Sequence, residues 1–199
     1  METVKPYNII IAGVGGQGVF SLTRVIWKLC ELAGMKCQGS TFKGGAQKLG
    51  SVYSALRIFL DPTENYNRYS TQIPDKDLDL MIGLEPWETL RYHRYFHRHT
   101  KIYMNTMTIP LLQEGQKIVG SQDPVEMVRE MELPTSALDY TKSALHLFGT
   151  SKMVNYKIGF DAVAAKDLPF QVEDYVDVFL EQVKVDESVR RRIKDEFQQ

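Results

Sequence analysis

The stretch that most constrains the fold is IIIAGVGGQGVF at residues 9–20, an apolar run that leads into four closely spaced glycines. Such a run of β-branched residues is typical of a strand buried on both faces of a parallel sheet. From Gln17 to Ala33 the apolar residues recur at spacings of three and four, which predicts an amphipathic helix that stops near Gly34. Strand, glycine turn and helix in this order are the context in which a glycine-rich loop binds phosphate.

The rest of the chain continues this alternation of strands and helices. We expect strands at 8–12, 36–38, 51–60, 78–84, 101–105 and 117–119, a polar loop at 39–50, and helices at 17–33, 86–97, from 124, 151–165, 172–183 and 187–197. The pattern predicts an α/β fold, a three-layer α/β/α sandwich around an open, mostly parallel, Rossmann-like sheet with a helical C-terminal region. We interpret residues 1–199 as a single domain, with 169–199 as a C-terminal helical extension.

Charge and composition narrow the partners and the compartment. The net charge of −1 gives no global basic excess, so we expect no nucleic-acid partner. No apolar run reaches the ~18 residues of a membrane span, and METVKPYNIII lacks the features of a signal peptide, so we expect no membrane partner. The two cysteines, Cys30 and Cys37, exclude a disulfide scaffold and match no zinc or redox spacing. We therefore expect a cytoplasmic protein whose thiols are reduced and packed.

The glycine loop has the G-x-G-x-x-G spacing of dinucleotide-binding turns, at Gly13, Gly15 and Gly18. An NAD site also needs an acidic residue roughly 20 residues further on, at the end of the second strand, to bind the ribose. That neighbourhood, Gly39 to Phe42, contains no acid, and no Gly-Lys-Ser/Thr follows the glycines as in a P-loop. The loop therefore predicts phosphate binding without NAD, while a tight strand-to-helix crossover with no ligand stays open. The predicted phosphate cradle is Gly13, Val14, Gly15, Gly16, Gln17, Gly18 and Val19.

Four stretches in order resemble one known family. They are GVGGQGV at 13–19, KGGAQKLGSV at 43–52, LEP with Glu88, Leu90 and Arg91 at 84–91, and Asn105-Thr106 with Ile109-Pro110. Together they resemble the γ subunit, or γ domain, of 2-oxoacid:ferredoxin oxidoreductases, and within that family the small (β) subunit of indolepyruvate ferredoxin oxidoreductase. Asn155 is similar to an asparagine that opens a late helix in the family. The resemblance is dense over residues 8–110.

The resemblance implies an enzyme subunit that is inactive alone. Such complexes oxidatively decarboxylate a 2-oxoacid, here indolepyruvate or another one, to an acyl-CoA, with ferredoxin as electron acceptor. The γ part is implied to bind coenzyme A and to complete the active-site cleft. Thiamine diphosphate and iron–sulfur clusters are expected in a large partner subunit of the same heteromeric complex. The two cysteines of this chain cannot ligate such a cluster, so we expect no metal here.

The implied site extends beyond the glycine loop. A second loop would contribute Ser40, Thr41, Lys43, Gln47 and Lys48, with the lysines pairing phosphate charge, while Glu85, Asn105 and Thr106 would border the cleft. We assign no catalytic residue. In this loop the family's His-Gly-Met is replaced by Lys43-Gly44-Gly45, which removes a histidine and leaves the oxoacid substrate open.

Two other features have alternative interpretations. His93 and His97, four apart on the predicted helix 86–97, have a metal-chelating spacing, but the surrounding arginines disfavour a cation and favour a basic face for an acidic partner. Two alternatives to the enzyme subunit also stay open. One is a non-catalytic docking subunit of such a complex, and the other is a stand-alone nucleotide-binding Rossmann protein.

Overall fold

The computed structural model describes residues 5–44, 50–61, 63, 69–109 and 122–197. Its centre is a six-stranded sheet in the order β2-β3-β1-β4-β5-β6. The strands are β1 (Tyr7–Val14), β2 (Lys36–Lys43), β3 (Ser51–Phe59), β4 (Leu80–Gly83), β5 (Lys101–Asn105) and β6 (Thr135–Leu138). Neighbours from β1 to β6 run parallel, whereas β3 is antiparallel to both β1 and β2. The predicted open, mostly parallel sheet is confirmed.

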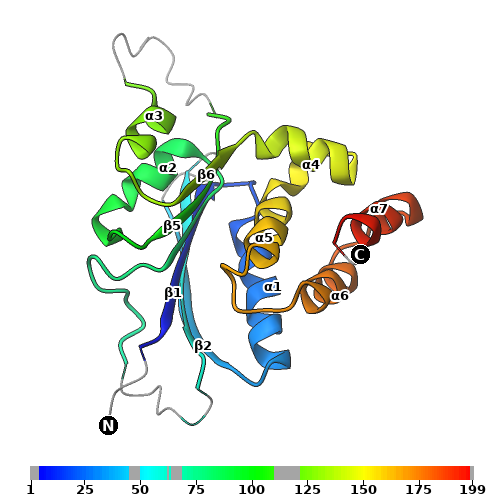
Figure 1. Ribbon diagram of the computed structural model, residues 1–199, viewed down its shortest axis with the longest axis horizontal. Helices are drawn as coiled ribbons and strands as arrows, with labels where there is room; N and C mark the ends of the chain where they lie inside the picture. Colours follow the sequence, from blue (N-terminus) through cyan, green and yellow to red (C-terminus); the bar gives the residue numbers. More distant parts are fainter. Residues whose placement is uncertain (1–4, 45–49, 62, 64–68, 110–121, 198–199) are drawn as a thin grey trace.

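Helices cover both faces of this sheet (Figure 1). On one face lie α1 (Val19–Leu32), α4 (Tyr140–Phe148), α5 (Val154–Ala164), α6 (Val172–Gln182) and α7 (Glu187–Phe197), and on the other lie α2 (Pro86–Arg91) and α3 (Pro124–Arg129). Strand β1 shows why its sequence is uniformly apolar: Ile9 and Ile11 pack in the core beneath α1, while Ile10 packs beneath α2. Alternate side chains of a strand point to opposite faces, so a strand covered twice needs apolar residues throughout.

The predicted loop at 39–50 is wrong in its first part. Strand β2 continues to Lys43 and pairs residue by residue with β3, as far as Lys43 opposite Val52. Gly39 had indicated a loop, but a Cβ there would overlap the carbonyl oxygen of Ala55, so this glycine permits close strand pairing. Tertiary pairing has overridden the weak strand preference of Gly39 and Ser40.

The predicted helix 86–97 needs revision, one strand was not predicted, and another predicted strand lies outside the described residues. Helix α2 ends at Arg91 and a short 3-10 turn, His93–Tyr95, follows it, so His93 and His97 do not share a helix. Strand β6 was missed because its four residues, TSAL, lack a strong apolar pattern. The strand predicted at 117–119 falls outside the described part of the chain. The helices predicted at 172–183 and 187–197 are confirmed, with α7 occupying Glu187–Phe197.

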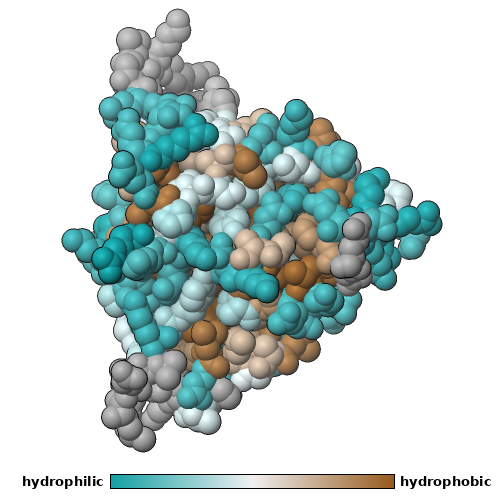
Figure 2. All heavy atoms as spheres, in the orientation of Figure 1, coloured by the Kyte–Doolittle hydropathy of each residue, from teal (hydrophilic) through white to brown (hydrophobic). Residues whose placement is uncertain are grey.

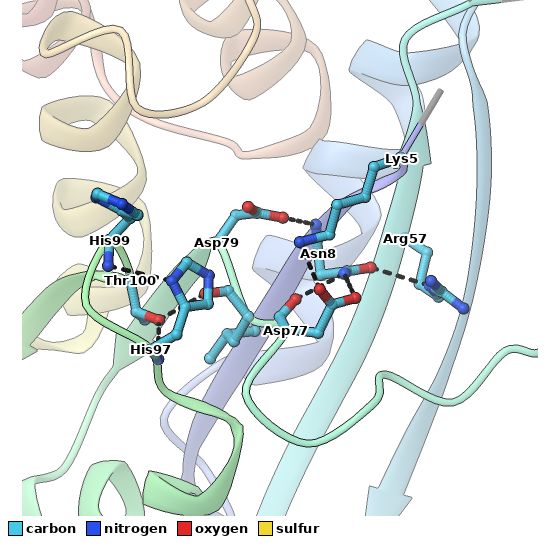
Figure 3. Close-up of polar contacts among 9 residues, drawn as sticks. Lys5, Asn8, Arg57, Asp77, Asp79, His97, His99 and Thr100 are labelled. Atoms are coloured by element: carbon cyan, nitrogen blue, oxygen red, sulfur yellow. Dashed lines mark hydrogen bonds and ion pairs between the residues drawn. The ribbon is translucent and has the colours of Figure 1, made fainter. Parts of the chain in front are cut away.

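A polar cluster closes the sheet at the amino end of β1 (Figure 3). The buried Asn8 side chain donates to the Asp77 carbonyl oxygen at 2.7 Å and accepts from Arg57 Nε at 2.9 Å. Its backbone N–H donates to Asp79 Oδ2 at 2.7 Å. His97 joins from the loop after α2, with its backbone N–H on Thr100 Oγ1. The histidine-rich segment thus belongs to a structural cluster at the edge opposite the glycine loop.

The structure also bears on the two cysteines, on metal-binding groups and on membrane-spanning helices. Cys30 is buried and Cys37 is half-buried against the same core, and both are free thiols. Within the described ranges, no group of three or more His, Cys, Asp or Glu side chains could hold a metal ion. No helix in that same part of the chain combines the length and apolar character needed to cross a membrane.

Candidate ligand site at the glycine loop

The glycine loop follows the carboxyl end of β1, where the chain order of the sheet reverses. On one side of β1 lie β3 and β2, and on the other lie β4, β5 and β6. In open α/β sheets such a switch point leaves a crevice outside the carboxyl ends of the strands, and ligands bind there. The fold therefore puts Gly13 to Val19 where a ligand-binding loop is expected.

Gln17 holds the loop to the neighbouring strand. Its Oε1 accepts a hydrogen bond from the Val14 N–H at 2.8 Å, and its Nε2 donates to the Leu84 carbonyl oxygen at 3.0 Å. A Cβ at Gly13 would lie 2.6 Å from Gln17 Oε1, so glycine at 13 leaves room for this clamp. The glutamine fixes the path of the loop.

Gly18 begins α1 in a conformation that favours glycine, with φ of 81°. The buried Asn155, from the first turn of α5, donates from Nδ2 to the Gly18 carbonyl oxygen at 3.0 Å. A Cβ at Gly18 would lie 2.6 Å from that same nitrogen. Asn155 Oδ1 is buried and has no hydrogen-bond partner among the described residues. A residue 137 positions away therefore sets the start of the helix.

The hairpin of β2 and β3 lies beside the loop and uses one of its donors. The Gly15 N–H donates to the Gly50 carbonyl oxygen at 2.9 Å. No hydrogen bond among the described residues uses the N–H of Gly16 or Gly18. The donors available to an anion are therefore these two groups and the first turn of α1, where the helix dipole also favours negative charge.

Two hollows border the glycine loop and a third lies beyond Phe20, and most of the described residues of the predicted site are divided among them. The first, here the loop cavity, has a volume of about 600 Å³. It is lined by Val14, Gly15, Gly16, Gly18, Val19, Phe20, Ser21, Lys43, Gly44 and Val52. Lys43 is exposed and brings a positive charge to a wall otherwise made of glycines, valines, Ser21 and Phe20. This composition suits a phosphate group.

The second hollow, here the switch pocket, is smaller, at about 190 Å³. It lies on the other side of Gly16 and is lined by Gly16, Gln17, Asn105, Met107, Ile109, Thr141, Ser151, Lys152 and Val154. The buried Asn105 side chain is engaged within the protein, since Nδ2 donates to Thr141 Oγ1 at 3.0 Å. Its Oδ1 accepts from the Thr141 N–H at 3.3 Å. Asn105 therefore shapes the pocket and joins β5 to α4.

The third hollow, here the α1–β2 groove, is the largest, at about 860 Å³. Ser40 and Thr41 line this groove and not the loop cavity, because β2 carries them onto the sheet. The Thr41 and Ser54 hydroxyls are hydrogen-bonded to each other at 2.7 Å. The structure thus separates Ser40 and Thr41 from Lys43. Gln47 and Lys48 lie outside the described residues.

Glu85 lies at the carboxyl end of β4, as predicted, but lines none of the three hollows. It is 3% exposed and caps α2, with Oε2 accepting from the Glu88 N–H at 2.9 Å. Burial raises the pKa of its carboxyl group, and the backbone N–H of Glu88 opposes that rise. Oε1 has no hydrogen-bond partner among the described residues. Glu85 therefore fixes the start of α2 beside the crevice without lining it.

Thr106 and Glu88 complete this edge of the sheet. The Thr106 backbone N–H donates to the Leu138 carbonyl oxygen at 2.9 Å, which joins the end of β5 to β6. Glu88 accepts from Ser51 Oγ at 2.5 Å and forms two hydrogen bonds with Arg91 at 3.1 and 3.2 Å. Sequence patterns gave no sign that Ser51 and Glu88 meet, because the contact joins β3 to α2 across the sheet edge.

Among the lining residues that the sequence-based prediction did not include are Phe20, Thr141 and Lys152. In the sequence nothing sets Phe20 apart from other helix residues, yet in the structure it borders both the loop cavity and the α1–β2 groove. Thr141 and Lys152 come from the starts of α4 and of the turn before α5, far from the glycines in sequence. Only tertiary packing brings them to Gly16.

An open α/β sheet with a glycine-rich strand-to-helix loop at its switch point defines the class of Rossmann-like α/β domains. More specifically, the chain belongs to the pyruvate ferredoxin/flavodoxin oxidoreductase family, whose model matches residues 8–196. It is 32% identical over 129 residues to indolepyruvate oxidoreductase subunit IorB of Thermococcus kodakarensis. That match covers 65% of this chain and spans about three fifths (61%) of the relative's length.

Solved structures agree on the fold. The pyruvate oxidoreductase subunit PORC of Thermotoga maritima superposes with a TM-score of 0.65 at 17% identity, covering 98% of this chain and 97% of that one. A 2-oxoglutarate:ferredoxin oxidoreductase of Magnetococcus marinus, solved with 2-oxoglutarate, coenzyme A and succinyl-CoA bound, gives a TM-score of 0.63 at 14% identity. This chain covers 30% of that longer protein, and 98% of this chain is aligned.

Proposed function

We propose that this chain is the γ-type subunit of a 2-oxoacid:ferredoxin oxidoreductase and binds the phosphates of coenzyme A at its glycine loop. The observation that carries the proposal is the loop cavity. Gly16, Gly18 and the start of α1 line it with N–H groups that no described residue accepts from, and Lys43 adds positive charge. Family membership supports the same reaction class.

Coenzyme A suits this cavity better than NAD does. Strand β2 is followed by Gly44, and residues 36–44 contain no acid that could bind a ribose diol. The phosphates of coenzyme A need donors and positive charge, which the loop and Lys43 supply. Lys43 acts as a point charge without the fixed fork of arginine, so it suits phosphates of varied orientation.

The reaction requires a partner. We propose a large subunit that carries thiamine diphosphate and iron–sulfur clusters, with ferredoxin accepting the electrons and the complex located in the cytoplasm. This chain has two cysteines, and they lie on α1 and β2 against the core, so the redox centres belong elsewhere. Its own residues would bind and orient coenzyme A. The substrate is indolepyruvate or another 2-oxoacid, chosen by the partner.

Calorimetry on the full chain with coenzyme A, ADP and NAD tests the binding step. We expect coenzyme A and ADP to bind and NAD to bind much more weakly. Lys43→Gln should weaken coenzyme A about tenfold through loss of a charge-assisted contact, while Lys101→Gln, at the opposite edge of the sheet, should not. Tight binding of NAD without any response to coenzyme A or ADP would contradict the proposal.

A docking subunit without a ligand is the second candidate. The internal hydrogen bonds of Gln17, Gly15 and Asn155 favour it, because they give the glycine loop a purely structural use. A Gly16→Ala variant separates the two candidates. A Cβ there meets no atom within 4 Å and belongs to the wall of the loop cavity, while the positive φ of 100° adds backbone strain, so an intact fold is checked first. If that variant assembles normally and the complex keeps its full activity at limiting coenzyme A, the docking role is preferred.

A further inference from the structure

Helix α1 carries large aromatic side chains on the face that points away from the hydrophobic core. Its buried face includes Leu22, Ile26 and Leu29. On the outer side, Phe20 is 54% exposed and Trp27 is 47% exposed. Exposed aromatic groups beside a hollow are typical of a binding surface and serve no purpose in the core of this domain.

These side chains face the α1–β2 groove. Its floor is apolar, with Cys30, Met35 and Leu56, and its far wall is the inner side of β2. The groove lies between α1 and β2, and β2 is the edge strand of the sheet. Figure 2 shows hydrophobic surface reaching the exterior near the lower end of α1. Its volume of about 860 Å³ falls in the range of small-molecule sites.

The charged groups around the groove leave a positive balance. Arg24 and Lys36 line it, together with the exposed ion pair of Lys28 and Glu31 at 3.0 Å. Arg24 lies between the two aromatic residues, four positions after Phe20 and three before Trp27, and so shares their side of the helix. Arg24 makes no ion pair with any residue that the structure describes. An arginine beside an aromatic surface favours a ligand that joins an anion to a flat ring.

The groove adjoins the loop cavity, since Phe20 lines both hollows. A ligand whose diphosphate occupies the loop cavity can therefore extend one end past Phe20 into the groove. We infer that the α1–β2 groove binds the adenosine 3′-phosphate end of coenzyme A, with the adenine against Phe20 and Trp27 and the 3′-phosphate at Arg24. This inference rests on the proposed function and adds the part of the site that recognises the nucleoside.

The assignment also sets the direction of the ligand. The adenosine end lies toward β2, so the pantetheine arm leaves the loop cavity past Gly16 or out of its mouth. The switch pocket, at about 190 Å³, is too narrow for a nucleoside but borders Gly16. The thiol then points away from the groove, toward the carboxyl ends of β4 and β5, where a partner subunit would meet it.

Three ligands measured by calorimetry on the full chain test the inference: coenzyme A, 3′-dephospho-coenzyme A and 4′-phosphopantetheine. Trp27→Ala should weaken both nucleotide ligands about tenfold, as loss of base stacking does elsewhere, and leave phosphopantetheine unchanged. Arg24→Gln should weaken coenzyme A about tenfold and leave the dephospho form unchanged. Leu145→Ala, an exposed apolar residue on α4, and Arg98→Gln are the matched controls.

The outcomes separate this inference from the proposed function. If Lys43→Gln weakens coenzyme A while Trp27→Ala and Arg24→Gln do not, the phosphates bind at the loop and the groove assignment is overturned. If Arg24→Gln weakens coenzyme A and its dephospho form equally, the 3′-phosphate assignment is overturned. If the wild-type chain, with its native unfolding transition, binds none of the three ligands, the proposed function fails with it.

Discussion

Glu85 carries a buried carboxyl group that is hydrogen-bonded through one oxygen. Its burial raises the pKa above the ordinary value of 4.5, so the folded protein holds this proton more tightly than the unfolded chain does. The stabilisation from the protonated group is therefore complete below the unfolded pKa and is lost as pH rises toward the folded pKa. We predict that Glu85→Gln gains in unfolding free energy relative to wild type as pH rises above 4.5.

Chemical denaturation at a series of pH values measures this difference. Glutamine keeps an oxygen that can cap α2, so the comparison isolates the charge. Glu126→Gln, whose side chain is 56% exposed, is the control and should show no such trend. A Glu85→Gln curve that stays parallel to wild type at every pH contradicts the assigned shift.

Gly18 gives a second prediction at the scale of single residues. Gly18→Ala combines a left-handed backbone, φ 81°, with a Cβ 2.6 Å from Asn155 Nδ2. Gly34→Ala is a matched control, because Gly34 has φ of 67° and open space around its Cβ position. Both should lose about 1–3 kcal/mol from backbone strain, and Gly18→Ala should lose more because of the steric contact. Removing Asn155 in the Gly18→Ala background should recover that extra loss, whereas equal losses in the two alanine variants contradict it.

For single residues, the sequence predicts the glycine loop well but does not predict the distant residues that contact the loop. The spacing of Gly13, Gly15 and Gly18 predicts a strand-to-helix turn, and the missing acid argues against NAD. The sequence does not show where Asn155 and Phe20 lie in space, because their positions depend on how α5 and β2 pack against α1. Such contacts between distant segments leave no local pattern.

At the scale of elements, the packing of α5 depends on a glycine. A Cβ at Gly159 would overlap the Tyr175 hydroxyl of α6 and lie 2.9 Å from Leu22 Cδ1 of α1. We predict that Gly159→Ala destabilises the protein by about 1–3 kcal/mol through overpacking. Thermal unfolding of Gly159→Ala, Tyr175→Phe and the double variant checks this. The double variant should lose less than the sum of the single changes, and strict additivity would contradict the contact.

Helices whose apolar residues recur at a regular helical spacing were predictable from the sequence. Strands that depend on hydrogen bonds to a neighbouring strand were not. The helices α1, α6 and α7 follow apolar spacings of three and four, which a sequence displays directly. Strand β2 contains Gly39, Ser40 and Thr41, which individually indicate a loop, and it exists because β3 supplies a full set of hydrogen-bonding partners. The short β6 likewise depends on β5.

For the whole molecule, the α1–β2 groove lies between a helix and the edge strand of the sheet, and the carboxyl edge of the sheet carries the glycine loop. That edge brings the loop cavity and the switch pocket together around Gly16. The family match supports a role in a larger enzyme. Under the proposed function, this domain contributes to that enzyme by binding and orienting coenzyme A.

The most direct test of that account is the Michaelis constant for coenzyme A in ferredoxin reduction by the assembled complex, with wild-type or Gly16→Ala subunit. A methyl group at Gly16 would extend from the wall of the loop cavity and meet no protein atom within 4 Å, but the positive φ of 100° adds backbone strain, so the comparison requires a variant whose unfolding transition stays native-like. We predict a rise of about tenfold or more in the constant for coenzyme A, with the constant for the 2-oxoacid and the assembly unchanged. An unchanged constant for coenzyme A in an intact Gly16→Ala complex would contradict the account.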